Sequence, residues 1–452
     1  MWNRLRQIGA TKEGTGVVAL SQSIPNHDPY WWEAAPREPK SDLVLPEKVD
    51  VLVVGAGYAG LSAALTLARA GRSVLVCEVG PPGFGASSRS GGMIGHGHRL
   101  SYSGLIDRYG ESTAKAMILE GMASLDYAKT LIAETGMDAG LRPVGRLRGA
   151  WTTADYDTMG READLLRRNV GLDVDVVLKS DMRREISTDA YQGGLIFHSH
   201  AGLHPALFQQ GLLAAAREAG AIVVGYCAVE GWSREADGFR VATQRGTLKA
   251  TELVVTTNGY SGRPFVPLAR RVVPIPSYLI ATEELGENRV RELIPSMRMI
   301  VETREKHLYY RPSPDHKRIV LGGRAALHPI DLDNAGARLR RELVALFPSL
   351  SDVAVSHVWT GNVAMTRSDL PGVGQRDGLW YALGCNGSGV ALMPYLGHRL
   401  AQKILGQPDG RTAFDDIPFT AVPFYDGRPW FLPFMTLAFR ARDLWREIRT
   451  GQ

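Results

Sequence analysis

Three glycines and a later carboxylate are the residues of this chain whose spacing most clearly indicates chemistry. The glycine segment follows the pattern G-x-G-x-x-G and comprises Gly55, Gly57, Tyr58, Ala59 and Gly60. In that pattern the first glycine permits a tight turn, the second lets the backbone approach a pyrophosphate, and the third lets a helix pack closely on a strand. Glu78 follows at the distance where a carboxylate accepts hydrogen bonds from a ribose and repels a 2′-phosphate. The pattern predicts a dinucleotide site and disfavours NADP, but it leaves FAD and NAD both open.

The elements around these residues are those that such a site needs. Residues 49–54 are a β-branched run typical of a buried parallel strand, and residues 61–70 predict a helix that Gly71 closes. Residues 73–77 predict the second strand, which ends at Glu78. This strand-turn-helix-strand context makes a purely structural glycine turn the weaker interpretation.

Two further segments of small residues favour FAD over NAD. The first follows Glu78 and includes Ser87, Ser88, Arg89, Ser90, Gly91, Gly92 and Met93. The second joins a predicted strand at 379–383 to a predicted helix at about 390–404 and includes Gly384, Asn386, Gly387, Ser388, Gly389 and Val390. The first is suited to wrap a phosphate and to let a flat ring lie on bare backbone. The second places helix amides where they could stabilise a reduced isoalloxazine or bind ribityl hydroxyls.

Length and charge limit the remaining possibilities. A chain of 452 residues is too long for one simple core, so two domains are expected. The net charge of +5 suits an anionic cofactor or substrate, and no basic run interleaved with aromatic residues supports nucleic-acid binding. Cys77, Cys227 and Cys385 form no CxxC pair, which argues against a disulfide framework and a cysteine zinc site.

The sequence also predicts the cellular compartment and the order of the domains. No apolar run reaches membrane-spanning length and the N-terminal residues form no signal peptide, so a cytoplasmic protein is expected and a membrane partner is not. Nucleotide-domain segments recur along the chain, which predicts an α/β fold: a Rossmann-like FAD-binding domain with an inserted α+β substrate domain on a large mixed sheet. The FAD-binding domain is expected at 1–100, 200–270 and 355–452, with a proline-rich extended arm at 1–47. The substrate domain is expected at 101–199 and 271–354.

Seven separated motifs carry a family resemblance between about residues 49 and 405. They read VVGAGYAGLSAALTLARAG, CEVGPPGFGASSRSGGM, GLHPALFQQGLLAAAREAGA, VVTTNGYSG, LYYRPSPDHKRIVLGGR, WTGNVAMTRSDLPGVG and GLWYALGCNGSGVALMPYLG. In this order they resemble the glycine oxidase, sarcosine oxidase and D-amino-acid oxidase superfamily, closest to the bacterial γ-glutamylputrescine oxidase-like branch. The resemblance implies a substrate domain whose sheet covers the flavin. It also implies oxidation of a primary or secondary amine or amino acid, with hydride transfer to flavin N5 and hydrolysis of the imine.

The resemblance also implies roles for single positions. Val229 would contact the adenine, and Asn258 and Gly259 would lie where the chain passes the cofactor. Residues 358–362 lack the cysteine that links covalently to flavin in sarcosine oxidases, so noncovalent FAD is expected. Val320 stands where those enzymes place an oxygen-activating lysine, so the electron acceptor could be O2 or another molecule.

The substrate side is predicted from a strand at 308–311. Alternation puts Tyr309 and Arg311 on one face, with His307 beside them, so these three are the candidate catalytic residues. Arg311 could pair with a substrate carboxylate, and Tyr309 could line the pocket; an ordinary strand pair is the competing interpretation. Arg324 and Arg148 are the next candidates for the anchor.

Other histidines and the tail are interpreted as structural. His96 and His98 are different, because they could line the flavin edge; they form an HxH pair without a third ligand, so no metal is expected. The cluster of His198, His200 and His204 is interpreted as structural. The aromatic segment 429–435 and the arginines after it predict packing on the body more than a membrane-surface helix.

Three alternatives to an amine oxidase stay open. The first is a dehydrogenase of the same fold that passes electrons to a quinone or a carrier protein. The second is an NAD(P)H-dependent flavin reductase or monooxygenase, although no second complete G-x-G-x-x-G follows a strand. The third is a flavin-binding protein without catalysis.

Overall fold

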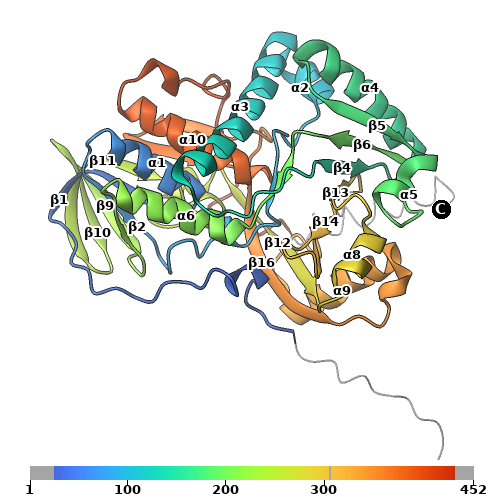
Figure 1. The fold of residues 1–452 in the computed structure, drawn as a ribbon. Coiled ribbons are helices and arrows are strands. Elements are labelled where there is room, and N and C mark those ends of the chain that lie inside the picture. The colour runs from blue at the N-terminus through green and yellow to red at the C-terminus, as the bar shows by residue number, and fades with distance from the viewer. Residues whose placement is uncertain (1–24, 305–306, 433–452) are drawn as a thin grey trace, which may run out of the picture.

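The chain folds around two large sheets, as a computed structural model shows for residues 25–304 and 307–432 (Figure 1). Each sheet has eight strands, and β3 (Met93–Ile94) and β7 (Ala201–Gly202) form a third, two-stranded sheet. Each large sheet is assembled from segments that are distant in sequence. This interleaved α/β organisation agrees with the predicted fold class.

The first sheet contains the glycine motif. Its strands are β1 (Lys48–Val54), β2 (Val74–Cys77), β8 (Ile222–Val224), β9 (Val229–Glu235), β10 (Gly238–Thr243), β11 (Gly246–Val255), β17 (Gly372–Arg376) and β18 (Leu379–Leu383). The order β17-β18-β11-β1-β2-β8 is parallel from β18 to β8, whereas β17, β10 and β9 pair in antiparallel fashion. The carboxyl ends of β1, β2, β11 and β18 therefore meet at one edge, where open parallel sheets bind ligands.

Ten α-helices are present in the described part of the chain, and several of them cover this sheet. They are α1 (Tyr58–Arg69), α2 (Tyr102–Tyr109), α3 (Glu111–Thr135), α4 (Thr153–Val170), α5 (Met182–Glu185), α6 (Pro205–Glu218), α7 (Val266–Ala269), α8 (Glu287–Leu293), α9 (Leu332–Leu346) and α10 (Gly389–Ile404). Helices α1 and α10 touch through backbone, since a Cβ at Gly397 would lie 2.1 Å from the carbonyl oxygen of Ala59. Glycine is therefore required where the N-terminal and C-terminal segments of the fold meet.

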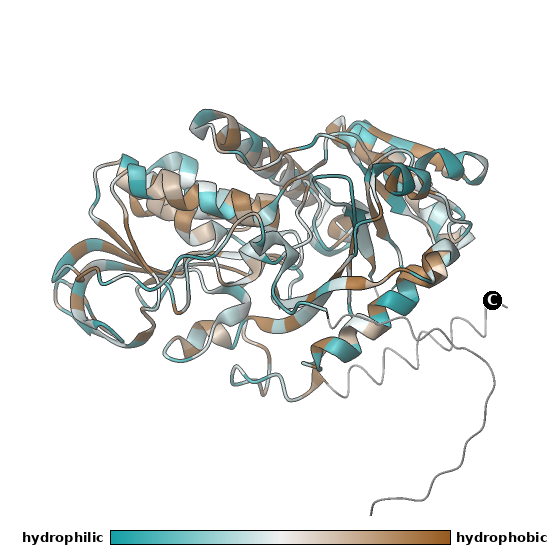
Figure 2. Ribbon diagram, turned by 60° about the horizontal axis from the view of Figure 1, so that its bottom comes forward, coloured by the Kyte–Doolittle hydropathy of each residue, from teal (hydrophilic) through white to brown (hydrophobic). Residues whose placement is uncertain are grey.

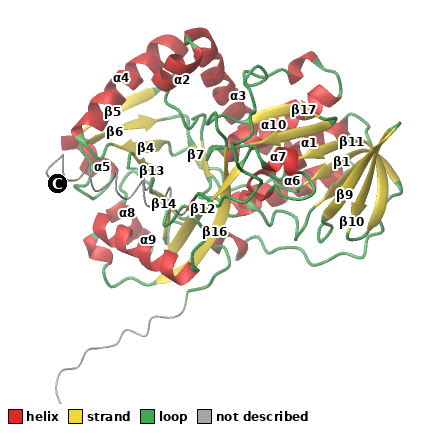
Figure 3. Cartoon of the chain, turned by 180° about the vertical axis from the view of Figure 1, so that it is seen from behind, coloured by secondary structure: helices red, strands yellow, loops and turns green. Residues whose placement is uncertain are grey.

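The second sheet is mixed. Its strands are β4 (Arg146–Gly149), β5 (Val174–Leu178), β6 (Gly193–Phe197), β12 (Val273–Thr282), β13 (Met299–Glu302), β14 (Tyr309–Pro312), β15 (Ile319–Gly323) and β16 (Val355–Met365). The order is β16-β12-β15-β14-β13-β4-β6-β5, and only the β13–β4 pair is parallel among the pairs that the structure describes. The long strands β12 and β16 run side by side from one sheet toward the other (Figure 3).

The two faces of the second sheet have different neighbours. Leu147, Ile300 and Tyr310 pack into a core with helices α8 and α9. Side chains one residue along each strand, such as Tyr309, extend from the opposite face. Figure 2 shows the hydrophobic residues gathered along the strands, while the outer helices alternate between hydrophobic and hydrophilic residues.

The sheets differ from the predicted domain boundaries by one strand. A boundary at residue 355 assigns β16 to the nucleotide-binding part, but β16 pairs with β12 over almost its whole length, from Val355 to Met365. The mixed polar and apolar pattern of β16 contained no signal for its partner strand. Helix α1 also begins earlier than predicted, at Tyr58, because Gly57 is its N-cap.

The described part of the predicted arm packs on the body. Trp31 is fully buried in an apolar cluster with Leu279, Val320 and Trp359 of the second sheet. No helix among the described residues is long and apolar enough to cross a membrane. Most of the aromatic-basic tail, residues 433–452, lies outside the described residues.

Candidate active site

The glycine motif and Glu78 meet at the end of β1 and β2. Gly55 has a φ of +106°, and a Cβ at Gly60 would lie 1.9 Å from the Gly55 carbonyl oxygen. The Glu78 carboxylate accepts hydrogen bonds from the backbone N–H of Ala56 at 2.8 Å and of Val79 at 2.9 Å. Burial raises the pKa of Glu78, and these amides partly oppose the shift. Glu78 thus lies against the turn where the nucleotide is expected.

The loop after Glu78 is held against helix α1. The Ser87 hydroxyl accepts from the Tyr58 N–H at 3.0 Å. The Ser88 hydroxyl donates to the Gly83 carbonyl oxygen at 2.6 Å and accepts from the Trp32 indole at 2.9 Å. These bonds fix the loop between the first helix and the N-terminal arm.

The same loop contacts the second sheet. The Arg89 carbonyl oxygen accepts from the Trp359 indole at 2.8 Å, and the Arg89 guanidinium donates to the Thr360 carbonyl oxygen at 3.2 Å. A Cβ at Gly91 would lie 2.8 Å from the ring of Tyr309. Ser90 accepts from the Gly92 N–H at 3.4 Å, and Met93 begins β3. The loop therefore lies between the two sheets.

The second small-residue segment begins where β18 ends. The Gly384 N–H donates to the Asn258 side chain at 2.9 Å, and the Asn386 amide donates to the Gly384 carbonyl oxygen at 2.8 Å. Ser388 is the N-cap of α10 but makes no side-chain cap bond, and Gly387 has a φ of +96°. The first amides of α10, from Gly389 and Val390 onward, are thus left without a side-chain cap.

The predicted adenine and connecting residues lie at the same edge. Val229 is the half-buried first residue of β9. Two positions earlier, the Cys227 N–H donates to the Glu78 carbonyl oxygen at 2.8 Å. Asn258 and Gly259 follow β11, and the Gly259 carbonyl oxygen accepts from the Asn362 amide of β16 at 3.3 Å.

These residues fit an FAD molecule. Gly57, the N-cap of α1, has no side chain, and Ser388, the N-cap of α10, makes no side-chain cap bond. Beyond the Tyr58 N–H, which Ser87 binds, the two helix N-termini therefore present amides to anionic or polar ligand groups. Glu78 would hold the ribose, α1 the pyrophosphate, and the segment 384–390 the ribityl and flavin end. Bound there, FAD would supply a two-electron acceptor.

Tyr309 lies opposite this edge. Its hydroxyl is 2.9 Å from the Ser277 hydroxyl, and burial raises its pKa to about 12. The phenol is therefore protonated at neutral pH. Its ring packs on the backbone of Gly91.

Arg311 shares the face of Tyr309 but is directed elsewhere. It is buried, and its guanidinium donates to the carbonyl oxygens of Gly92 at 2.8 Å, Leu203 at 2.9 Å and Pro312 at 3.1 Å. These contacts direct its Nε and Nη1 toward backbone carbonyls, and the binding of a substrate carboxylate by Arg311 stays a prediction. The contacts describe a positioning residue.

His307 precedes β14 with a φ of +53° and is exposed to water. Although the side chain is exposed at its surface, the protein around it limits its solvation, and this effect, followed by the charges of Arg324 and Arg148, lowers the pKa of His307 to about 3. His307 is therefore neutral at physiological pH. A neutral imidazole with so low a pKa is a weak general base, but it can accept or donate a hydrogen bond.

The remaining predicted histidines make structural contacts. His204 caps α6 by accepting from the Leu207 N–H at 3.2 Å, and His200 stacks on Phe197 with ring centroids 4.9 Å apart. His98 lies 2.7 Å from the Met117 carbonyl oxygen. Among the described residues, no group of three or more metal-ligating side chains could hold an ion.

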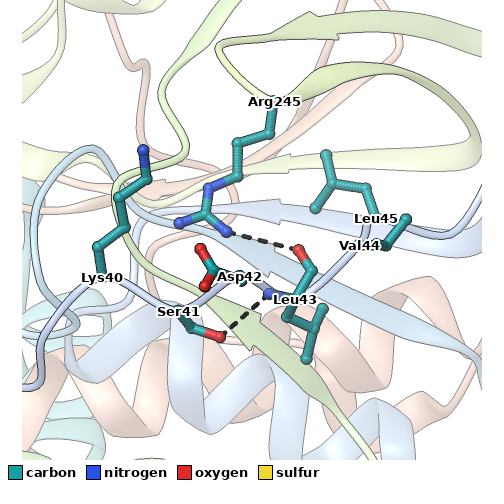
Figure 4. A pocket seen from close by; sticks show the side chains of 7 residues that line it. All are labelled: Lys40, Ser41, Asp42, Leu43, Val44, Leu45 and Arg245. Atoms are coloured by element: carbon teal, nitrogen blue, oxygen red, sulfur yellow. Dashed lines mark hydrogen bonds between the residues drawn. The ribbon is translucent and has the colours of Figure 1, made fainter.

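A separate pocket of about 300 Å³ lies between the N-terminal arm and Arg245 (Figure 4). It is lined by residues 40–45, and Arg245 donates to the Leu43 carbonyl oxygen at 3.5 Å. None of the residues predicted to bind FAD or substrate lines it. The predicted cofactor site is therefore elsewhere.

Sequence reasoning missed residues that join the two sheets. Trp32 and Trp359 bind two consecutive residues, Ser88 and Arg89, of the loop that follows Glu78, called the cofactor loop from here on. The Tyr260 hydroxyl accepts from the Asn362 N–H at 3.1 Å. Trp32 stands in an aromatic cluster of the arm and Trp359 opens one of the quoted motifs, but nothing local indicates their partners.

Comparison with known proteins decides the family. The model of the family "DAO: FAD dependent oxidoreductase" matches residues 50–403. The chain belongs to this family. It is therefore an FAD-dependent oxidoreductase, as the sequence predicted.

Individual relatives agree with this assignment. The chain is 31% identical to the γ-glutamylputrescine oxidoreductase of Escherichia coli K12, over 86% of this chain and 90% of that protein. It is 25% identical to the glycine oxidase of Bacillus licheniformis, over 80% of this chain and 94% of that protein. Among solved structures, glycine oxidase from Geobacillus kaustophilus matches with a TM-score of 0.69 and 22% identity, covering 84% of this chain and all of that one. The L-proline dehydrogenase from P. horikoshii matches with a TM-score of 0.65 and 18% identity, over 85% of this chain and 98% of that one.

Proposed function

We propose that this protein oxidises the C–N bond of a primary or secondary amine or amino acid to an imine, which water then hydrolyses. Two kinds of relative support the proposal, one named for γ-glutamylputrescine and one for glycine, since both compounds carry an amine. The FAD, bound noncovalently, would accept the hydride at N5.

The observation that carries the proposal is the contact between Tyr309 and Gly91. It brings the face of the second sheet onto the backbone of the cofactor loop. A substrate held on that face lies next to the flavin end of the site, with the Tyr309 phenol as a neutral wall. Arg311 positions Gly92 of the same loop, and Trp359 positions Arg89. In this proposal the first sheet and its helices are the FAD-binding domain and the second sheet is the substrate domain.

The electron acceptor has two candidates, O2 and a quinone or carrier protein. The second is favoured by the surroundings of Val320, which is buried in an apolar cluster with Trp31 and Leu279. An aliphatic side chain there gives no positive charge to stabilise a superoxide-like species. A dehydrogenase is therefore the second candidate function.

The experiment is an anaerobic screen of primary amines, secondary amines and amino acids for bleaching of the bound flavin. Bleaching by an amine supports the proposal, and re-oxidation rates with O2 and with a soluble quinone then separate oxidase from dehydrogenase. If no amine bleaches the flavin but NADH or NADPH does, the protein is a reductase or monooxygenase and the proposal is refuted.

A further inference from the structure

Two cysteines that are distant in sequence meet next to the predicted adenosine end of the cofactor site. Cys77 is the last residue of β2, directly before Glu78, and Cys227 lies two positions before Val229, the first residue of β9. Their Sγ atoms are 3.5 Å apart, although the two residues are 150 positions apart in the chain. Both side chains are buried, and neither is in a disulfide. The fold therefore creates a dithiol, the Cys77–Cys227 pair, that the cysteine spacing did not indicate.

Backbone hydrogen bonds tie the dithiol to Glu78. The Glu78 N–H donates to the Val224 carbonyl oxygen at 3.0 Å, and the Glu78 carbonyl oxygen accepts from the Cys227 N–H at 2.8 Å. Cys77 is the chain neighbour of Glu78 on the other side. Because both cysteines are attached to Glu78 in this way, neither sulfur can be displaced without disturbing the residue whose carboxylate is expected to hold the ribose.

The two thiols are chemically unequal. The hydrogen bond with Cys77, and to a smaller extent the Thr243 hydroxyl and the charge of Arg245, lower the pKa of Cys227 to about 7 against the opposing effect of burial. The same hydrogen bond, together with burial, raises the pKa of Cys77. The thiolate is the nucleophilic form of cysteine. Cys227 is therefore suited to attack an oxidant, and Cys77 is suited to attack the oxidised sulfur in a second step.

Arg245 connects the dithiol to the pocket of about 300 Å³ beside the N-terminal arm (Figure 4). Its Nε donates to the carbonyl oxygen of Tyr226, the residue before Cys227, at 3.2 Å. Its Nη2 is buried and has no hydrogen-bond partner among the described residues. The same guanidinium thus lines the pocket and places a positive charge near Cys227, which gives a small oxidant an approach from that side.

We propose that Cys77 and Cys227 form a reversible disulfide when the protein meets a hydroperoxide, and that this disulfide weakens FAD binding. The formation of the disulfide does not depend on which substrate the enzyme oxidises. Its effect on FAD rests on the predicted place of the ribose at Glu78.

The chemistry proceeds in two steps with hydrogen peroxide as the oxidant. The Cys227 thiolate attacks one peroxide oxygen, the O–O bond breaks, and the sulfur becomes a sulfenic acid while the other oxygen leaves as water after taking up a proton. The Cys77 sulfur then attacks the sulfenic sulfur, an S–S bond forms, the S–O bond breaks, and a second water leaves. The two thiols lose two electrons and two protons, and one peroxide is reduced to two waters. A dithiol reductant reverses the reaction by thiol–disulfide exchange.

The expected effect on the cofactor follows from the distance that the sulfurs must cover. They are 3.5 Å apart, whereas bonded disulfide sulfurs are about 2.05 Å apart. Closure therefore shifts at least one of the two segments bonded to Glu78. The Glu78 carboxylate accepts from the Ala56 N–H at 2.8 Å, and a shift misaligns it with both this amide and the ribose.

The first test detects the bond itself. FAD-loaded protein and apoprotein are treated with hydrogen peroxide, free thiols are alkylated after denaturation, and the chain is digested without reduction for mass spectrometry. We expect a peptide pair linked through Cys77 and Cys227, which dithiothreitol separates. Cys385 is the internal control, because it is also buried but packs on Gly389, and it should be recovered alkylated. Recovery of Cys227 as a free thiol or as a sulfinic acid, without the linked peptides, would overturn the inference.

The second test measures the affinity of the apoprotein for FAD by fluorescence titration before peroxide, after peroxide and after dithiothreitol. The dissociation constant should rise by about tenfold or more on oxidation, the loss expected for one charge-assisted hydrogen bond, and should return on reduction. Cys385→Ser should show the same ratio between its oxidised and reduced forms. Cys227→Ser and Cys227→Ala should show no change with peroxide.

Two results would refute the effect on FAD: equal dissociation constants for the linked and the reduced protein, or an equal loss of affinity in wild type and in the Cys227 variants. The peptide mapping uses wild type, so a folding defect in a variant leaves the first test decisive. Neither measurement involves an amine. Failure of every amine to bleach the flavin therefore refutes the proposed function, while the linked peptides alone decide whether the disulfide forms.

Discussion

The Nη1 of Arg311 donates a hydrogen bond to the carbonyl oxygen of Gly92 at 2.8 Å, and this bond joins strand β14 to the loop that follows Glu78. The same nitrogen donates to Leu203, just before helix α6, at 2.9 Å. One side chain of the second sheet therefore determines where two segments of the nucleotide-binding part lie. Through this side chain, the cofactor loop is held against the face of the second sheet that carries Tyr309.

Replacing Arg311 should accordingly affect stability and FAD binding, not only substrate affinity. In Arg311→Ala the buried carbonyls of Gly92 and Leu203 lose their donor, which should lower the free energy of unfolding by about 2–4 kcal/mol. FAD should bind more weakly, and Arg311→Lys should restore part of both. Urea unfolding and FAD titration measure the two effects. A variant with wild-type stability and FAD affinity, but a raised KM for a carboxylated substrate, would show instead that Arg311 binds the substrate carboxylate.

For Arg311, the sequence predicted the face of the strand but not the contacts of the side chain. Strand alternation correctly placed Arg311 and Tyr309 on one face, because that periodicity is local. What the face meets depends on carbonyls 219 and 108 positions away in sequence, which no local pattern encodes. The glycine motif was predictable for the opposite reason, since its turn, strand and helix are contiguous. Strand β16 was misplaced because its partner, β12, lies far away in sequence.

Removal of the Glu78 carboxylate should weaken FAD binding. Glu78→Ala loses a charge-assisted hydrogen bond to ribose, worth on the order of 1.5–3 kcal/mol, or about ten- to a hundredfold in affinity. It also releases the Ala56 N–H, which Glu78→Gln should still satisfy through its side-chain oxygen. Fluorescence titration of the apoprotein with FAD measures the effect. Equal dissociation constants for wild type and Glu78→Ala would show that another residue holds the ribose.

FAD should be released when the protein is denatured by acid or heat. Residues 358–362 contain no cysteine, and the one cysteine near the predicted flavin end, Cys385, is buried and packs on Gly389. The yellow colour should therefore pass into the supernatant. Flavin that stays with the precipitated chain would establish a covalent link, which peptide mapping around Cys385 and His96 would locate.

Trp31→Ala should destabilise the protein although it lies in the irregular arm. Trp31 is fully buried against Trp359, with ring centroids 6.2 Å apart, and truncation of such a side chain costs about 3–5 kcal/mol. Thermal unfolding measures the loss. Trp430→Ala, at an exposed position, is the matched control and should change stability little. Equal unfolding temperatures for the two variants would mean that the arm does not contribute to the fold.

Buried neutral histidines should make the protein less stable in mild acid. Burial, followed by the charge of Arg146, lowers the pKa of His96 to about 3, and burial followed by Arg311 lowers that of His204 to about 4. Histidine in the unfolded chain titrates near pH 6.5. As the pH falls from about 6.5 toward these values, the unfolded chain binds protons that the native protein excludes, so native stability decreases.

His96→Gln tests this linkage at one site. Each excluded proton contributes a slope of up to about 1.4 kcal/mol per pH unit to the free energy of unfolding. Wild type should therefore lose stability between pH 7 and pH 5, and His96→Gln should lose less over the same range, because its side chain takes up no proton in either state. Urea unfolding at the two pH values measures the difference, and His27→Gln, at an exposed position, is the control. A loss as large in His96→Gln as in wild type would contradict the assignment, since it would require that His96 binds a proton in the native protein at pH 5, despite its burial beside Arg146.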